Sequence, residues 1–229
     1  MLSRIEYIRA WNSRVGNRTL HFNIKNFTKE DRDSLYEQYK MILDNYNLEN
    51  KTIADYGCGG GLLGNYLYIN QIDIKKYIGI DIVDKCLHES RLNNSMWNHN
   101  VEVEINKINP YNFNLNIKAD ILIILNLIRY FPDKEYIDFF FNEINISKIK
   151  EVFLNFRNAK NNIFRKKPYK TTHDIGNANF LDVNYVIDRM NKYNVKNIIN
   201  KDGECYIFFE KRKRRTKKVE NINDNSISD

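Results

Sequence analysis

The sequence predicts an α/β fold: a doubly wound, mostly parallel seven-stranded sheet with an antiparallel strand pair that closes it. Three observations lead to this prediction. From Lys51 onward, short apolar runs alternate with segments of helical spacing. The first apolar run ends in a glycine-rich turn. The run at 119–125, ADILIIL, is apolar throughout, as expected of a strand buried on both faces of a sheet.

Apolar spacing and turn residues place the elements in order. The segment 29–46 has apolar residues on one helical face, so we expect a helix before the sheet. Five strands and four further helices follow, with strands at 52–57, 76–82, 101–106, 119–125 and 151–157 and helices at 62–69, 85–95, 133–146 and 181–191. The runs 195–200 and 204–210, separated by Lys-Asp-Gly, predict the closing antiparallel pair.

Composition and charge divide the chain into three parts. Of 229 residues, 42% are hydrophobic, which excludes a disordered chain. We expect a helical lid or cap at 1–48, an α/β domain at 49–210 and a basic, disordered tail at 211–229. The net charge is +7, and much of it comes from the run KRKRRTKK in the tail. Such a run is usually a solvated end, and binding to nucleic acid or another acidic surface is the alternative.

Several classes of protein are excluded at this stage. No apolar run approaches the ~18 residues of a transmembrane helix, and the N-terminus lacks the apolar region of a secretory signal. The three cysteines are scattered and have no CxxC spacing, which argues against a disulfide framework and a metal cluster. We therefore expect a cytoplasmic protein with no membrane partner and no metal; the sequence leaves the oligomeric state open.

A glycine-rich turn is the most informative motif. The first strand reaches Asp55, glycines follow at positions 57, 59 and 61, and a helix then begins. Glycine has no Cβ, so this loop can adopt positive φ and a ligand can lie against bare backbone, next to the N–H groups of a helix N-terminus. On its own such a turn suits NAD, FAD or S-adenosylmethionine, or is simply a tight turn before a helix.

Two carboxylates favour one of these ligands. Asp55 would repel a dinucleotide pyrophosphate, but it would attract the ammonium and sulfonium groups of S-adenosylmethionine. Asp81, at the end of the second strand, can accept hydrogen bonds from both hydroxyls of a ribose. One acid at the end of each strand therefore indicates a nucleoside with a cationic tail.

DYGCGGG at 55–61, GID at 79–81 and the apolar run at 119–125 together resemble the class I S-adenosylmethionine-dependent methyltransferases. The resemblance covers roughly 52–130 and implies a Rossmann-like methyltransferase fold with S-adenosyl-L-methionine as cofactor, bound by the domain at 49–210. The residues that it places around the cofactor are Asp55, Gly57, Cys58, Gly59, Gly61, Asp81, Ile82, Asn106 and Asn126.

Their roles follow from the resemblance, with two departures from the family pattern. The glycine motif with Asp55 would line the methionine end, Asp81 would hold the ribose, and Ile82 would pack on the adenine. After the third strand many members carry an Asp that meets the adenine amino group, where this chain offers Asn106. After the fourth strand, Asn126 is not followed by the Pro-Pro-aromatic motif of the enzymes that methylate amino groups of nucleic-acid bases, which argues against that activity.

Class I enzymes usually build the substrate pocket from the N-terminal segment and the loops after strands four and five. The corresponding stretches are 11–24, residues 129–131 (Arg129, Tyr130 and Phe131) directly after the fourth strand, and the long polar connection 156–181. Their alternatives are a helix packed on the sheet edge, a helix-start staple and an ordinary surface loop. The residues expected to bind the substrate are Trp11, Arg14, His21, Tyr130, Tyr169, His173 and Asn177.

The acceptor decides whether a general base is needed. A hydroxyl acceptor needs a base near neutral pKa, and we expect His173 to be that catalytic base, with Asp174 or another carboxylate orienting its ring. An anionic acceptor such as a phosphate or carboxylate needs no base and would pair with cations instead. The cations available for this are Arg14, Arg18, Arg157, Arg165, Lys166 and Lys167.

Three functions are compatible with these observations. The first is a methyltransferase acting on an oxygen of a small molecule such as a sugar, nucleotide or surface-glycan precursor. The second is an RNA or other nucleic-acid methyltransferase that uses the basic tail; it is not favoured, because residues 1–209 carry a net charge of only +4. The third is a cofactor-binding scaffold without catalytic activity.

Overall fold

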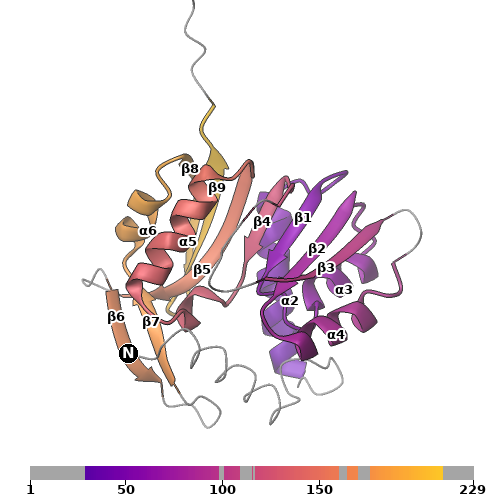
Figure 1. The fold of residues 1–229 in the computed structure, drawn as a ribbon, viewed down its shortest axis with the longest axis horizontal. Coiled ribbons are helices and arrows are strands. Elements are labelled where there is room, and N and C mark those ends of the chain that lie inside the picture. Colours follow the sequence, from indigo (N-terminus) through magenta and orange to yellow (C-terminus); the bar gives the residue numbers. More distant parts are fainter. Residues whose placement is uncertain are drawn as a thin grey trace, which may run out of the picture.

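Nine strands form one sheet in the structure, a computed structural model that describes residues 29–97, 101–108, 115, 117–159, 164–169 and 176–213 (Figure 1). The strands are β1 (Thr52–Tyr56), β2 (Lys76–Asp81), β3 (Glu102–Lys107), β4 (Ile121–Ile124), β5 (Glu151–Asn158), β6 (Phe164–Tyr169), β7 (Gly176–Leu181), β8 (Tyr193–Lys201) and β9 (Glu204–Lys211). The helices are α2 (Lys29–Asn45), α3 (Leu62–Ile69), α4 (Asp84–Asn93), the 3-10 helix η3 (Ile128–Tyr130), α5 (Lys134–Ile146) and α6 (Val183–Arg189).

The strand order confirms the predicted doubly wound α/β fold. Parallel pairing joins the first five strands in the order β3-β2-β1-β4-β5. β9 then pairs antiparallel with β5, and β8 pairs antiparallel with β9, as expected of the closing pair. All four residues of β4 are buried, which agrees with the uniformly apolar run at this place in the sequence.

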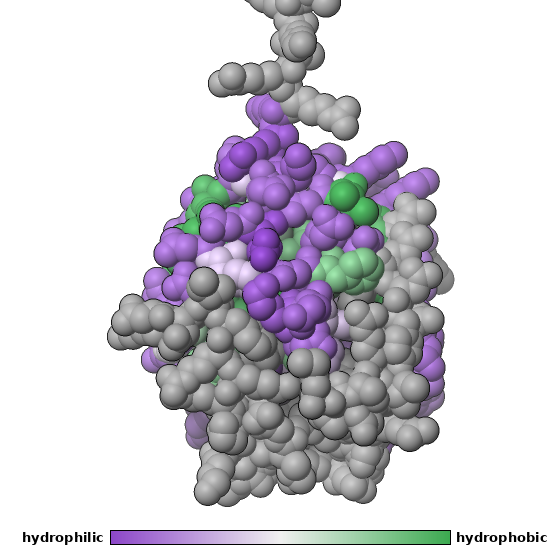
Figure 2. Space-filling model, turned by 60° about the vertical axis from the view of Figure 1, so that its left-hand side comes forward, coloured by the Kyte–Doolittle hydropathy of each residue, from purple (hydrophilic) through white to green (hydrophobic). Residues whose placement is uncertain are grey.

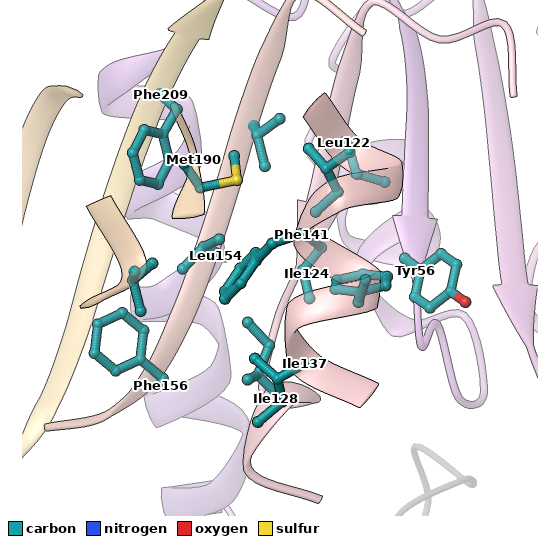
Figure 3. Packing of buried hydrophobic residues seen from close by; sticks show 14 of the residues in the cluster. Tyr56, Leu122, Ile124, Ile128, Ile137, Phe141, Leu154, Phe156, Met190 and Phe209 are labelled. Atoms are coloured by element: carbon teal, nitrogen blue, oxygen red, sulfur yellow. The ribbon is translucent and has the colours of Figure 1, made fainter. Parts of the chain in front are cut away.

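One hydrophobic core lies between the sheet and the two helices α5 and α6. Alternate residues of a strand point to opposite faces, so Leu122 and Ile124 of β4 point to this side. Figure 3 shows Ile137 and Phe141 of α5 packed against this face of the sheet, next to Leu154 of β5. The helix begins at an Asp133 side chain that accepts a hydrogen bond from the Tyr136 N–H, the usual role of an N-cap aspartate.

A second core lies on the other face, under α2 and α3, so helices cover both faces of the sheet (Figure 1). Ile53 of β1 and Ile123 of β4 point to this side and pack with Ile42 of α2, which is completely buried. α2 is fixed at its far end by Tyr46, whose hydroxyl donates to the Val152 carbonyl at 2.7 Å. Replacing Ile42 with Ala would cost ~2–5 kcal/mol of stability, the usual range for a buried aliphatic side chain.

The sheet has nine strands and not the predicted seven, because the connection 156–181 contains the hairpin β6–β7. β7 pairs with the last residues of β5, where Arg157 lies opposite Phe180 and Asn158 opposite Leu181. β6 has the sequence FRKKPY, whose charges and proline hide the apolar alternation of a strand, so pairing with β7 decides its conformation. We expected a loop over this connection, which is wrong for the twelve residues of β6 and β7.

Smaller differences occur at element ends. The helix expected at 181–191 spans only Val183–Arg189, because Leu181 belongs to β7 and Asp182 caps the helix. The Lys-Asp-Gly turn forms as predicted, with positive φ at Asp202 (53°) and Gly203 (78°). The division of the chain at 48 and 210 stays a prediction, and residues 1–28 and 214–229 lie outside the described part.

One face of the molecule is largely polar, and none of the described helices is of the membrane-spanning type. Figure 2 shows a face whose described residues are mostly hydrophilic, with hydrophobic residues in small separate patches. Within the described residues, no helix combines the length and hydropathy that a bilayer crossing requires.

Candidate functional site

The glycine-rich turn after β1 forms a tight loop against the end of β2. The N–H groups of Gly57 and Cys58 both donate to the Ile80 carbonyl, at 2.8 and 3.0 Å. Gly57, Gly59 and Gly61 have φ of 83°, 51° and 73°, values at which a residue with a Cβ is strained. The three alternate glycines therefore define the course of this loop.

Asp81 closes the loop from the end of β2. One carboxylate oxygen accepts the Gly59 N–H and the other accepts the Val83 N–H, both at 3.0 Å. Burial raises the pKa of Asp81, and the N–H groups of Val83, Gly59 and Ile82 counteract part of that rise. The structure thus brings Asp81 into contact with the glycine motif, although Asp81 lies 22 residues after Gly59 in the sequence.

Asp55 lies beneath the loop and is 5% exposed. Its pKa is raised to about 7: burial is the main cause and the negative charge of Asp81 adds to it, whereas a hydrogen bond from the Tyr77 hydroxyl at 2.7 Å counteracts part of the rise. The Asp55 charge also contributes to the raised pKa of Tyr39 in α2, behind the effect of burial. Sequence reasoning missed both tyrosines, because a tyrosine in a strand or on an apolar helix face is ordinary core.

The loop is held from the other side by the end of α4. Asn93 donates to the Gly60 carbonyl at 2.7 Å and Asn94 donates to the Gly61 carbonyl at 3.1 Å. A Cβ on Gly61 would lie 2.3 Å from Asn94 Nδ2 and 2.4 Å from Ser90 Oγ. Gly61 is therefore required by helix packing as well as by its backbone conformation.

Cys58 is part of the loop but is buried in it. Its Sγ lies 3.9 Å from Ser90 Oγ and 3.6 Å from the Gly59 carbonyl oxygen. Burial raises the pKa of the Cys58 thiol well above its ordinary value, and the charges of Asp55 and Asp81 add to this. The thiol is therefore neutral at physiological pH, which suits a packing role and not a nucleophile.

The segment after β4 meets the glycine loop. A Cβ on Gly57 would lie 3.0 Å from both Leu127 methyl carbons, so the two segments are in close contact. β1 and β4 are parallel neighbours in the sheet. From β1 the chain adds β2 and β3 on one side and then returns to add β4 and β5 on the other side, so the strand order reverses between β1 and β4. In open α/β sheets this switch point, at the carboxyl ends of the strands, is where ligands bind.

Asn126 lies at the centre of a polar network at the end of β4. It has a φ of 57°, and its amide donates to Gln38 Oε1 of α2 at 3.0 Å. Its Oδ1 accepts hydrogen bonds from Asn155 of β5, at 3.0 Å, and from Arg129 of η3. Asn126 was predicted to contact the cofactor, but in the structure its side chain is engaged in this network.

Two arginines and a glutamate continue that network toward β9. Glu204 accepts from Arg129 Nη2 at 3.1 Å through one oxygen and from Arg157 Nε at 3.3 Å through the other. We call Asn126, Arg129, Asn155, Arg157 and Glu204 the Arg129 cluster. Sequence reasoning named Asn126 for the cofactor, Arg129 in the stretch after the fourth strand, and Arg157 as a cation for an anionic acceptor. It missed Asn155 and Glu204, which nothing in the local sequence links to the other three.

The other predicted residues occupy three kinds of place. Ile82 is half-buried and packs against Val83 and Cys86. Asn106 is exposed on β3 and donates to Glu104, and Tyr130 is half-buried with its ring centroid 5.9 Å from the Arg129 guanidinium carbon. Trp11, Arg14, His21 and His173 lie outside the described residues; Tyr169 and Asn177 are described only as backbone positions in β6 and β7.

The architecture is that of known methyltransferases. One similar structure is that of the N-methyltransferase NodS from Bradyrhizobium japonicum WM9, solved with S-adenosyl-L-homocysteine. It superposes with a TM-score of 0.64 at 12% identity, over 88% of this chain and 100% of that one. The chain has the class I methyltransferase fold. Magnesium protoporphyrin IX methyltransferase (ChlM) from Synechocystis PCC 6803 gives a TM-score of 0.65 at 13% identity, over 92% of this chain and 100% of that one.

A third structure extends the range of acceptors among these neighbours. The small RNA methyltransferase HEN1 gives a TM-score of 0.58 at 16% identity, over 82% of this chain but only 26% of its own. No family model matches this chain, and no curated protein matches it in sequence. The comparisons thus confirm the predicted fold, and the differing acceptors named for the neighbours leave that of this chain undetermined.

Proposed function

We propose that the protein is an S-adenosylmethionine-dependent methyltransferase that acts on an oxygen atom of a small molecule. One observation carries the proposal: the Asp81 carboxylate is bonded to the Gly59 N–H, so the acid of β2 and the glycine loop of β1 form one unit. Asp55 lies beneath the same loop. Neighbours with this fold were solved with S-adenosylhomocysteine or S-adenosylmethionine bound.

The side chains present fit this cofactor. Each Asp81 oxygen accepts one N–H bond described above, and a carboxylate oxygen has a second lone pair that a ribose hydroxyl can use. Gly57 and Gly59 leave the loop without side chains, so the methionine part can lie against backbone. Asp55, poised near neutral pKa, would ionise fully next to an ammonium or sulfonium group.

The chain's own contribution to the reaction is positioning. S-adenosylmethionine, when bound, supplies an electrophilic methyl group. The loop and Asp81 would fix the donor, and the segment after β4 would face it across the switch point, because Leu127 contacts Gly57. Methyl transfer needs the acceptor oxygen, methyl carbon and sulfur in line, and holding them so supplies much of the rate.

The acceptor side follows from the sequence expectations. A hydroxyl acceptor would give its proton to His173, whereas an anionic oxygen would need only cationic partners. Three buried free cysteines support a cytoplasmic location, where thiols stay reduced. The Pro-Pro-aromatic motif does not follow Asn126, which supports an acceptor other than a base amino group.

RNA is the alternative acceptor, since one structural neighbour is a small RNA methyltransferase and the chain carries a basic run at 211–218. Mobility-shift assays with mixed RNA, run at several salt concentrations between about 50 and 200 mM, discriminate the two acceptors. Binding through phosphate contacts weakens steeply as the salt concentration rises. A salt-sensitive shift favours RNA; no shift at low salt favours a small molecule.

The test of the proposed function is calorimetric titration with S-adenosylhomocysteine. We expect binding by the intact protein and a loss of ~30-fold or more in affinity for Asp81→Ala, which removes both the ribose acceptor and the Gly59 anchor. Asp84→Ala is the control, because Asp84 is exposed and its ion pair within the described residues is a surface contact with Lys107 at 2.6 Å. No binding by the intact protein, or equal affinity in Asp81→Ala, would overturn the proposal.

A further inference from the structure

The Arg129 cluster occupies the half of the switch point that the glycine loop leaves open. Arg129 lies in η3, two residues after Leu127, which contacts Gly57. Arg157 and Glu204 come from the carboxyl end of β5 and the start of β9, which pair with each other. The cluster is therefore beside the proposed cofactor loop, on the side where an acceptor has to approach.

The charges of the cluster are held in a largely buried place. The side chains of Arg129, Glu204 and Arg157 are 12%, 14% and 20% exposed. Glu204 divides its two oxygens between the two guanidinium groups, at 3.1 and 3.3 Å. Because Glu204 also pairs with Arg157, it gives Arg129 less compensation than an undivided ion pair would, in surroundings where charge is poorly screened.

Arg129 also has an unused donor. Among the described interactions, its Nη2 donates to Asn126 and Glu204, whereas its Nε is buried and has no hydrogen-bond partner. A buried donor without an acceptor costs free energy. An oxyanion is the acceptor that suits such a donor best, because a hydrogen bond between a guanidinium and an anionic oxygen is charge-assisted and about twice as strong as a neutral one.

We propose that the Arg129 cluster is a subsite for an oxyanion, a carboxylate or phosphate, of the methyl acceptor, with Arg129 as the binding residue. Asn126 and Glu204 are positioning residues that hold its guanidinium. The inference rests on the proposed function for the identity of the ligand as methyl acceptor, but the subsite itself can be measured without the cofactor. Its small exposed area suits a small molecule and not an extended nucleic-acid backbone.

The test titrates the protein with two probes, inorganic phosphate and benzoate, at low ionic strength, with and without saturating S-adenosylhomocysteine. Calorimetry reports the affinity for each probe, and comparison of the two shows which oxyanion the subsite prefers. We expect Arg129→Gln to weaken the preferred probe ~10-fold or more, because it removes the charge and the paired donors.

Glu204→Gln separates recognition from structure. It breaks the same ion pair as Arg129→Gln but removes a negative charge, so we expect it to tighten probe binding ~3-fold or more. A purely structural ion pair would make both variants change binding in the same direction. Arg189→Gln is the matched control: Arg189 of α6 pairs with Asp138 of α5 at 2.7 Å, and this variant should bind the probes as the intact protein does.

The outcomes distinguish the two levels of the argument. No probe binding by the intact protein, equal loss in Arg189→Gln, or changes of the same sign in Arg129→Gln and Glu204→Gln would overturn the oxyanion subsite. If Arg129→Gln fails to fold, the direction of the change in Glu204→Gln decides. Failure to bind S-adenosylhomocysteine with normal probe binding would instead overturn the proposed function and leave the subsite.

Discussion

The two sides of the switch point are built in different ways. On the β1–β2 side, a short loop of glycines is anchored by Asp81 through backbone N–H groups. On the β4–β5 side, the Arg129 cluster joins side chains from η3, β5, β9 and the connection after β4 through ion pairs and amide hydrogen bonds. The features of the first side do not depend on which acceptor is methylated, whereas the second side uses side chains that can be matched to a particular acceptor.

This difference accounts for what the sequence could predict. Gly57, Gly59, Gly61 and Asp81 were found because positive φ and a strand-end carboxylate require particular residue types at fixed short spacing. Arg129 directly follows the fourth strand, which marked it for the substrate side, but Glu204 lies 75 residues further on and nothing local marks it as part of a site. Only the antiparallel pairing of β9 with β5 brings them together.

The same reasoning explains the errors in the fold. The parallel strands were predicted because short apolar runs alternate with helical patterns, and β4 most clearly, because it is apolar and buried along its whole length. β6 and β7 were missed because their residues are polar and their pairing is set by each other and by the end of β5. Local sequence therefore determined the centre of the sheet, and tertiary contacts determined its margin.

The largest predicted effect is on the glycine-loop side. Gly61→Ala combines an unfavourable φ of 73° with a Cβ 2.3 Å from Asn94, and we expect a loss of ~3–5 kcal/mol in stability by urea unfolding. Gly203→Ala has nearly the same φ, 78°, but meets nothing within 4 Å, so it should lose only ~1 kcal/mol. Equal losses would show that packing against α4 is unimportant.

A second effect concerns the pH dependence of that side. The folded pKa of Asp55 is raised to about 7 from an ordinary value of 3.8, so the folded state binds more protons between these values and stability falls as pH rises through this window. Asp55→Asn removes this dependence. Without ligand it should be more stable than the intact protein by up to ~4 kcal/mol at pH 8, and by much less at pH 4.

Urea unfolding of both proteins at about pH 4, 6 and 8, a range that spans the titration of Asp55, measures this difference in stability. The same ionisation should make S-adenosylhomocysteine bind more tightly as pH rises through 7 in the intact protein but not in Asp55→Asn. Parallel stability curves for the two proteins would mean that Asp55 is not buried as described.

A smaller effect sharpens the comparison from the other side. Gln38→Ala removes the hydrogen bond from Asn126 at 3.0 Å that links α2 to the Arg129 cluster, and should cost ~1 kcal/mol of stability. S-adenosylhomocysteine affinity should stay within ~2-fold of that of the intact protein, because Gln38 does not touch the glycine loop. A large loss of affinity would show that the two sides are not independent.

The most direct measurement is a crystal structure of the protein with S-adenosylhomocysteine bound. The account predicts the ribose hydroxyls within hydrogen-bond distance of the Asp81 carboxylate, the methionine part along the Gly57–Gly61 backbone, and the sulfur facing the Arg129 side of the switch point. A ligand bound elsewhere, or a ribose without contact to Asp81, would contradict it.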